Sequence, residues 1–231
     1  MNIKEYTIEL KKQTDTIFEE SIKKENHLAN TYELINNLDL WVKALENKYD
    51  CLMIRNSIEE IEISLHQINQ GLYRGSFVSL RLALEMITGF VYFSSHNIEF
   101  VEWLNGDRDL KWAEISCKEN GILSSRFFSA YYKELQSIQE ESFSILKNLY
   151  RELSEMVHGN YLTWNNSKPE LKLDLSKIDL FDNYISNFKK ISSRILSLRF
   201  LKEIDKNNIE DLMFEETLTI NEIRKYIGGP V

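Results

Sequence analysis

The stretch ILKNLYRELSEMVHGNYLTW, residues 145–164, decides how the rest of the chain is interpreted. Gly159 predicts the end of a helix here, since glycine tolerates the left-handed conformation that terminates many helices. Arg151 and His158 precede it and lie two turns apart, about 20° from each other around the axis. Both should therefore project from one side of the helix. The helix itself is predicted by apolar residues at three- and four-residue steps, namely Leu146, Leu149, Leu153, Met156 and Val157.

An arginine and a histidine on one helix stripe are suited to phosphate chemistry. RNA can be cleaved without a metal when a base removes the 2′-OH proton and a cation stabilises the charged phosphorane. The guanidinium of Arg151 suits phosphate oxygens, and an imidazole can serve as acid or base. The helix C-terminus and nearby Glu155 favour a charged His158, which suits phosphate contact or acid catalysis. Two alternatives remain: His158 caps the helix carbonyls structurally, or the pair recognises another phosphate or a nucleotide.

Composition predicts long helices. Among 231 residues there are only two prolines and eight glycines, fewer than the turns of an all-β fold require. Hydrophobic residues make up 43% and charged residues 28%, which is ordinary for a soluble domain. The net charge of −8 means that the surface as a whole does not attract nucleic acid, so any RNA contact must be local.

Cysteine usage and the N-terminal sequence indicate a cytoplasmic protein. Cys51 and Cys117 form no CxxC and have no metal-ligand spacing to a histidine, so we expect free thiols in a reducing compartment and no metal or other cofactor. The N-terminal residues MNIKEYTIELKK are amphipathic and charged, unlike a signal peptide. No uncharged run approaches the roughly 20 residues of a membrane span, so no membrane contact is expected.

Hydrophobic periodicity divides the chain into an N-terminal helical extension packed on the bundle (1–50), a central helical bundle (51–204) and a short helical tail (205–231). The first two helices are expected on the outside of the bundle, and the alternative is an arm that packs on a partner. A loop with a possible short hairpin is expected around residues 160–175. The expected helices are 3–24, 27–48, 51–70, 76–94 starting at Ser76 as N-cap, two short helices within 97–125, 126–158 broken near Ser137, 177–204, and one or two in the tail.

The expected helix at residues 76–94 is apolar on nearly all sides, which is typical of a central bundle helix. Its two charges, Arg81 and Glu85, are four residues apart and so adjacent on the helix surface. At least half-buried, they should lie within salt-bridge distance of each other or of other polar partners. They form a structural ion pair or, alternatively, reach the same pocket as the arginine and histidine described above.

A local excess of positive charge marks the last long helix. Between residues 189 and 202 there are five basic residues and no acid, in a chain that is acidic overall. This run is either a solvated helix face or a stripe that contacts RNA phosphates. The residues are Lys189, Lys190, Arg194, Arg199 and Lys202.

Two motifs resemble those of a known superfamily. The sequence YRELSEMVHG, residues 150–159, looks like the LSxxVHG helix end of a broad group of bacterial helical proteins, and LRLALE, residues 80–85, fits the LRxxLE helix that often precedes it. That group resembles the HEPN superfamily, whose domains are bundles of four or five helices. The resemblance covers roughly residues 50–200. It implies an all-α, HEPN-like bundle with extra N-terminal helices and a short C-terminal tail.

The resemblance also implies an activity. Many HEPN domains are metal-independent RNases of toxin, phage-defence and stress systems, and they use an arginine and a histidine with four to six residues between them, acting across a dimer interface. Arg151 and His158, with six residues between them, fit that pattern, although Glu152 stands where active members usually have a small polar residue. The implied partners are RNA, a second copy of the chain, and an antitoxin or ATPase protein. The alternative is a non-catalytic helical module that binds a partner protein or a nucleotide.

Overall fold

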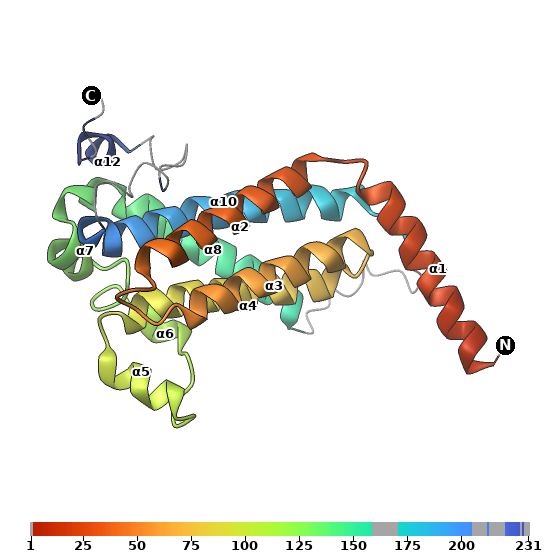
Figure 1. Cartoon of the computed structure of the whole chain (residues 1–231), viewed down its shortest axis with the longest axis horizontal. Helices are drawn as coiled ribbons and strands as arrows, with labels where there is room; N and C mark the ends of the chain where they lie inside the picture. Colours follow the sequence, from red (N-terminus) through yellow and green to blue (C-terminus); the bar gives the residue numbers. More distant parts are fainter. Residues whose placement is uncertain (1, 159–170, 205–211, 213–219, 227, 229–231) are drawn as a thin grey trace.

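The computed structural model describes residues 2–158, 171–204, 212, 220–226 and 228. Within these ranges all regular structure is helical and no strand occurs, as the composition predicts. Figure 1 shows five long helices running side by side as a bundle. They are α2 (Asn26–Leu45), α3 (Leu52–Asn69), α4 (Tyr73–Phe93), α8 (Gln139–Val157) and α10 (Leu175–Phe200).

Helix α4 lies at the centre of this bundle, packed against α3, α8 and α10. Residues such as Leu80, Leu84 and Ile87 are fully buried. By length and composition α4 could cross a membrane, but 67% of its apolar window is buried within the protein. The core helix of a soluble protein can have the same length and composition, and the other helices cover most of α4, although Val78 and Leu82 are 40% and 37% exposed.

Helix α4 begins earlier than expected, and Ser76 is not its N-cap. The helix starts at Tyr73, and no side chain caps its first turn. Ser76 instead lies buried in the contact with α3, where its Oγ is 3.0 Å from the Oγ of Ser64. The Ser64 hydroxyl also donates to the Ser76 carbonyl at 2.7 Å. The small serine side chains let the backbones of α3 and α4 approach closely. Capping preferences, which concern one helix only, do not predict this contact between two helices.

The region between α4 and α8 forms short helices at one end of the bundle. The predicted break in the 126–158 helix near Ser137 is confirmed: a first helix ends at Tyr131, a 3-10 helix spans Lys133–Ile138, and α8 begins at Gln139. Trp103 packs against the core. These helices are α5 (Asn97–Leu104), α6 (Trp112–Ile115), α7 (Ser125–Tyr131) and η1 (Lys133–Ile138).

The expected N-terminal extension divides into two parts. Helix α2 is part of the bundle, since Leu34, Leu38 and Trp41 are buried in the common core. Helix α1 (Ile3–Ser21) projects away from it, and only its C-terminal end contacts α3 (Figure 1). In the C-terminal tail α10 is followed by η2 (Leu201–Glu203), and α12 (Asn221–Tyr226) packs through Ile223. Gly159 and most of the expected hairpin lie outside the described residues.

Candidate functional site

Helix α8 has a buried side and an outer side, and the two candidate catalytic residues share the outer one. Leu146, Leu149 and Leu153 are at most 3% exposed and pack into the core. Arg151 and His158 are both exposed, and they lie about 120–180° around the helix from these three leucines. The predicted common stripe is therefore present in the folded chain.

The C-terminal end of α8 leaves the His158 side chain available. His158 is the C-cap residue, with extended backbone, and its N–H donates to the Ser154 carbonyl at 3.1 Å. The carbonyl of Met156 instead accepts a hydrogen bond at 2.8 Å from the guanidinium of Arg74, on α4. Within the described part of the chain, no side-chain hydrogen bond or ion pair involves Arg151 or His158. One of the helix-terminal carbonyls that His158 could have capped, that of Met156, is thus bound by Arg74 instead.

The predicted ion pair on α4 is confirmed and belongs to a larger polar cluster. The Arg81 guanidinium donates to Glu85 at 2.9 Å and to the hydroxyl of Tyr150, on α8, at 2.8 Å. That hydroxyl also lies 3.2 Å from the Glu85 carboxylate, and Trp112 of α6 stacks flat on the Tyr150 ring. The side chains of Arg81 and Glu85 are 23% and 24% exposed. The cluster joins three helices and holds α8 in place.

This cluster does not share a site with the outer face of α8. Tyr150 precedes Arg151 directly, but consecutive helix residues point about 100° apart. Tyr150 therefore turns toward α4 while Arg151 points outward. The structure thus supports the structural interpretation of Arg81 and Glu85 and does not place them beside the candidate catalytic pair.

Replacing Glu85 with alanine should destabilise the protein by about 1–3 kcal/mol, because the half-buried guanidinium of Arg81 would lose its charged partner. Thermal unfolding followed by circular dichroism measures the effect. Glu62→Ala, at an exposed position on α3, is the matched control and should change the melting temperature little. Equal melting temperatures for the two variants would contradict a structural role for the cluster.

The basic residues of α10 are tied to acids on neighbouring helices. Lys189 is 8% exposed and pairs with Glu33 of α2 at 2.9 Å. Arg194, only 6% exposed, pairs with Glu141 of α8 at 3.0 Å. Lys190 donates to the same carboxylate. The distance from the Lys190 ammonium to the Glu141 carboxylate is 2.6 Å.

Arg199 is also buried, and its guanidinium has several partners. Its guanidinium hydrogen-bonds Glu203, Ser94 and the hydroxyl of Tyr49, and it lies 4.2 Å from the ring centroid of Tyr131. Lys202, at the end of the helix, pairs with an exposed acid at 3.0 Å.

The five cations therefore do not form one exposed stripe, and this part of the sequence-based prediction needs correction. Their side chains point toward α2, α8 and the end of α4, because α10 is surrounded by other helices. A guanidinium such as that of Arg194 or Arg199, with under a tenth of its area exposed, is not available to an RNA phosphate. Three of the acids that neutralise them, at residues 33, 134 and 141, are brought close by the tertiary fold, whereas Glu203 is only four residues from Arg199.

Glu141 should make the stability pH-dependent. The hydrogen bond from Lys190 and, further, that from Arg194 lower the pKa of this carboxyl below 4.5, although desolvation opposes them. A carboxyl whose pKa is lower in the folded than in the unfolded state stabilises the fold at pH values above its unfolded-state pKa. This contribution is lost as the pH falls through the folded-state pKa. We therefore expect the melting temperature to fall below pH 4.5, and to fall less in Glu141→Gln.

Glu140→Gln provides the control for this prediction, because Glu140 is the exposed neighbour of Glu141 on the first turn of α8. It should follow the wild-type pH profile. An identical acid-induced decrease in wild type and Glu141→Gln would contradict the assigned role of Glu141.

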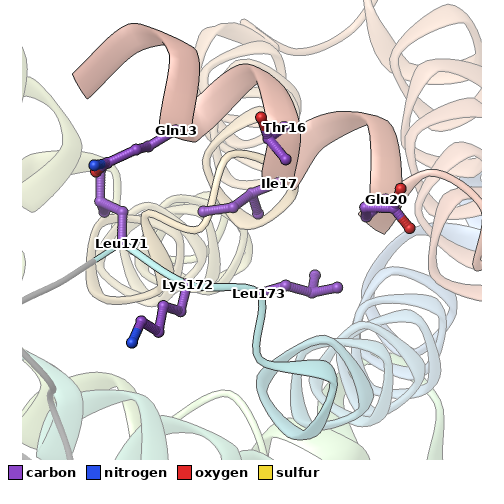
Figure 2. A pocket seen from close by; sticks show the side chains of 7 residues that line it. All are labelled: Gln13, Thr16, Ile17, Glu20, Leu171, Lys172 and Leu173. Carbon is purple, nitrogen blue, oxygen red and sulfur yellow. The ribbon is translucent and has the colours of Figure 1, made fainter. Parts of the chain in front are cut away.

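We also searched the described residues for a metal site, a reactive cysteine and a pocket. The described residues contain no cluster of three or more side chains that could hold a metal ion. Burial raises the pKa of the Cys51 thiol to about 11, which makes it a poor nucleophile. A shallow trough of about 280 Å³ lies between α1 and residues 171–173, away from the outer face of α8 (Figure 2).

Two structurally important residues carry no clear sequence signal. Tyr150 is part of the motif, but only its position against α4 shows that its hydroxyl completes the polar cluster. No spacing relates Arg74 to Met156, 82 residues away.

The chain was also compared with known proteins. No protein-family model, curated protein or solved structure matches it.

Proposed function

We propose that this protein is a cytoplasmic, metal-independent endoribonuclease, an RNase effector of a toxin or phage-defence system. Arg151 would bind the phosphate and stabilise its developing charge. His158 would transfer a proton at the 2′-hydroxyl or at the leaving oxygen. The site would lie in a groove between two copies of the chain.

One observation carries this proposal: the two residues are exposed on the same side of α8, and no side-chain bond within the described residues engages them. By contrast, the basic residues of α10 are paired within the fold, and Arg81 is engaged by Glu85 and Tyr150. Arg151 and His158 are therefore free to meet an external phosphate.

A second copy is part of the proposal because both residues are exposed to solvent on a single copy. Seven residues of helix separate their backbones by about 10 Å along the axis. Electrostatic stabilisation of a transition state is strong where water is excluded. A facing copy would exclude water and supply a second Arg151 and His158.

The test is cleavage of transfer RNA and total RNA by the purified protein in the presence of EDTA. The proposed chemistry joins the 2′-oxygen to phosphorus and breaks the bond to the 5′-oxygen, so the product should end in a 2′,3′-cyclic phosphate. Expression of the wild type should also slow bacterial growth. Intact RNA in EDTA, across a range of RNA substrates, would contradict the proposal.

A different function is favoured by the acidic residues on this helix. Glu155 is exposed close to the Arg151 stripe, and Glu152, which hydrogen-bonds Tyr184, adds negative charge nearby. Such a mixed surface suits a partner protein better than RNA. Should RNA remain intact, the non-catalytic module that binds a partner protein or nucleotide becomes the better description.

A further inference from the structure

Helix α1 is anchored at one end and unsupported at the other. Ile17 is 5% exposed, and it packs on Gly71 in the turn between α3 and α4. Gly71 has φ of +76°, and a side chain at this position would collide with Ile17. Residues 2–9, in contrast, are all exposed and lie beyond the bundle (Figure 1).

The unsupported half of α1 carries an apolar stripe that continues the buried one. Ile3, Tyr6 and Leu10 follow the same helix face as Ile17. Ile3 is 76% exposed and Tyr6 47% exposed. A short helix is only marginally stable alone in water, and most helices in proteins are stabilised by packing one apolar face. The apolar stripe on this half of α1 therefore has no packing partner among the described residues of the bundle.

A complementary surface lies beside the anchored half. Ile17, Leu171 and Leu173 line the trough between α1 and the chain leading into α10, as Figure 2 shows. Leu173 is 38% exposed, and the side chain of Lys172 points away from α1. The trough has about 280 Å³ of space, open to solvent along α1.

The charges of α1 are distributed in a self-complementary way. Residues 2–12 hold three lysines and two glutamates, whereas residues 13–22 hold three acids and no basic residue. Glu19 and Glu20 stand in the last turn, where acids are unfavourable; Glu20 pairs with Lys23 beyond the helix at 2.6 Å. An antiparallel copy of α1 would place a net positive N-terminal half against this acidic half.

We propose that two copies of this chain associate through antiparallel pairing of their α1 helices. Each copy inserts the N-terminal half of α1 into the trough of the other. The apolar stripe fixes the register: Tyr6 lies against Ile17 of the partner subunit, and Leu10 against Gln13 of the partner subunit. Ile3 then reaches the level of Glu20 of the partner subunit.

This inference does not depend on nuclease activity, but it bears on the proposed site. The trough lies at the same end of the bundle as the end of α8. Tyr73 donates to the Lys172 carbonyl at 3.0 Å, and the adjacent Arg74 binds the Met156 carbonyl at 2.8 Å. Pairing through α1 would therefore bring the His158 ends of two copies to the same side of the dimer.

The oligomeric state is the first test, measured on the full chain by size-exclusion chromatography with light scattering at micromolar concentrations. We expect twice the chain mass of 27.4 kDa for the wild type. Tyr6→Glu and Leu10→Glu should give monomers with an unchanged circular dichroism spectrum of the bundle. Ile8→Glu is the matched control: Ile8 is 56% exposed but lies about 200° around the helix from Tyr6, so the dimer should persist.

The second test is disulfide cross-linking in a Cys117→Ser background, with Cys51 left buried. Mixing the Ile3→Cys protein with the Glu20→Cys protein should give a cross-linked dimer under mild oxidation. The Ile3→Cys protein alone should not cross-link, because antiparallel pairing separates the two copies of residue 3 by about 25 Å.

A monomeric wild type would overturn the inference, as would a dimer that survives both Tyr6→Glu and Leu10→Glu. Cross-linking of the Ile3→Cys protein to itself would overturn the antiparallel arrangement. These outcomes are distinct from failure of the proposed function. A dimer lost on Tyr6→Glu in a protein that leaves RNA intact upholds the pairing and rejects the nuclease. RNA cleavage by a dimer that survives both Tyr6→Glu and Leu10→Glu upholds the nuclease and rejects the pairing.

Discussion

His158→Ala is expected to reduce the rate of RNA cleavage by about 10²–10⁴-fold, the usual contribution of a positioned general acid or base. The variant should fold normally, because the His158 side chain is exposed and makes no bond with another described residue. Initial rates on a defined RNA substrate in EDTA measure the effect. The same substitution should relieve the growth defect caused by expression of the wild type.

Arg151→Ala should reduce cleavage by about 10²–10³-fold if its guanidinium stabilises the charged phosphorane. Two controls match residue type and exposure: His66→Ala on α3 and Arg126→Ala on α7, both at exposed positions. Neither should change the rate. Activity that survives the loss of both Arg151 and His158, in a folded protein, would assign the chemistry to another part of the chain.

Arg199→Ala is expected to lower the free energy of unfolding by about 1.5–3 kcal/mol, the range for hydrogen bonds that involve a charged group. The side chain is 6% exposed, and its guanidinium satisfies Glu203, the hydroxyl of Tyr49 and both oxygens of Ser94. Alanine would leave these groups without their donor and would remove the packing of the guanidinium on Tyr131. Urea denaturation of the wild type and the variant measures the difference.

Arg55→Ala separates the effect of burial from the loss of an arginine. Arg55 pairs with Glu46 at 2.7 Å, but the two side chains are 49% and 46% exposed. Surface pairs of this kind contribute about 0–1 kcal/mol. A loss of stability as small for Arg199→Ala as for Arg55→Ala would contradict the structural assignment of Arg199.

The all-helical architecture was predictable because local physics dominates it. Few prolines and glycines, together with apolar residues at helical spacing, indicated each of the long helices to within a few residues. The same periodicity placed Leu149 and Leu153 in the core and Arg151 and His158 on the outside of one helix. It also placed Arg81 beside Glu85, since residues four apart on a helix are neighbours.

Periodicity within one helix, however, does not show what surrounds that helix. The spacing of the cations of α10 predicted a surface stripe. In the structure, Lys189 and Arg194 are instead neutralised by Glu33 and Glu141, which are distant in sequence.

The sequence by itself determined the helices, the face that each one buries and the common outer side of Arg151 and His158, because these depend on residues within one or two turns. Only the tertiary structure decided which charges remain free. It packs α10 among α2, α4 and α8 so that its cations meet acids of neighbouring helices, and it leaves the first half of α1 beyond the bundle. The physical reason is that burial and ion pairing depend on contacts between helices far apart in the chain, which helical periodicity does not encode.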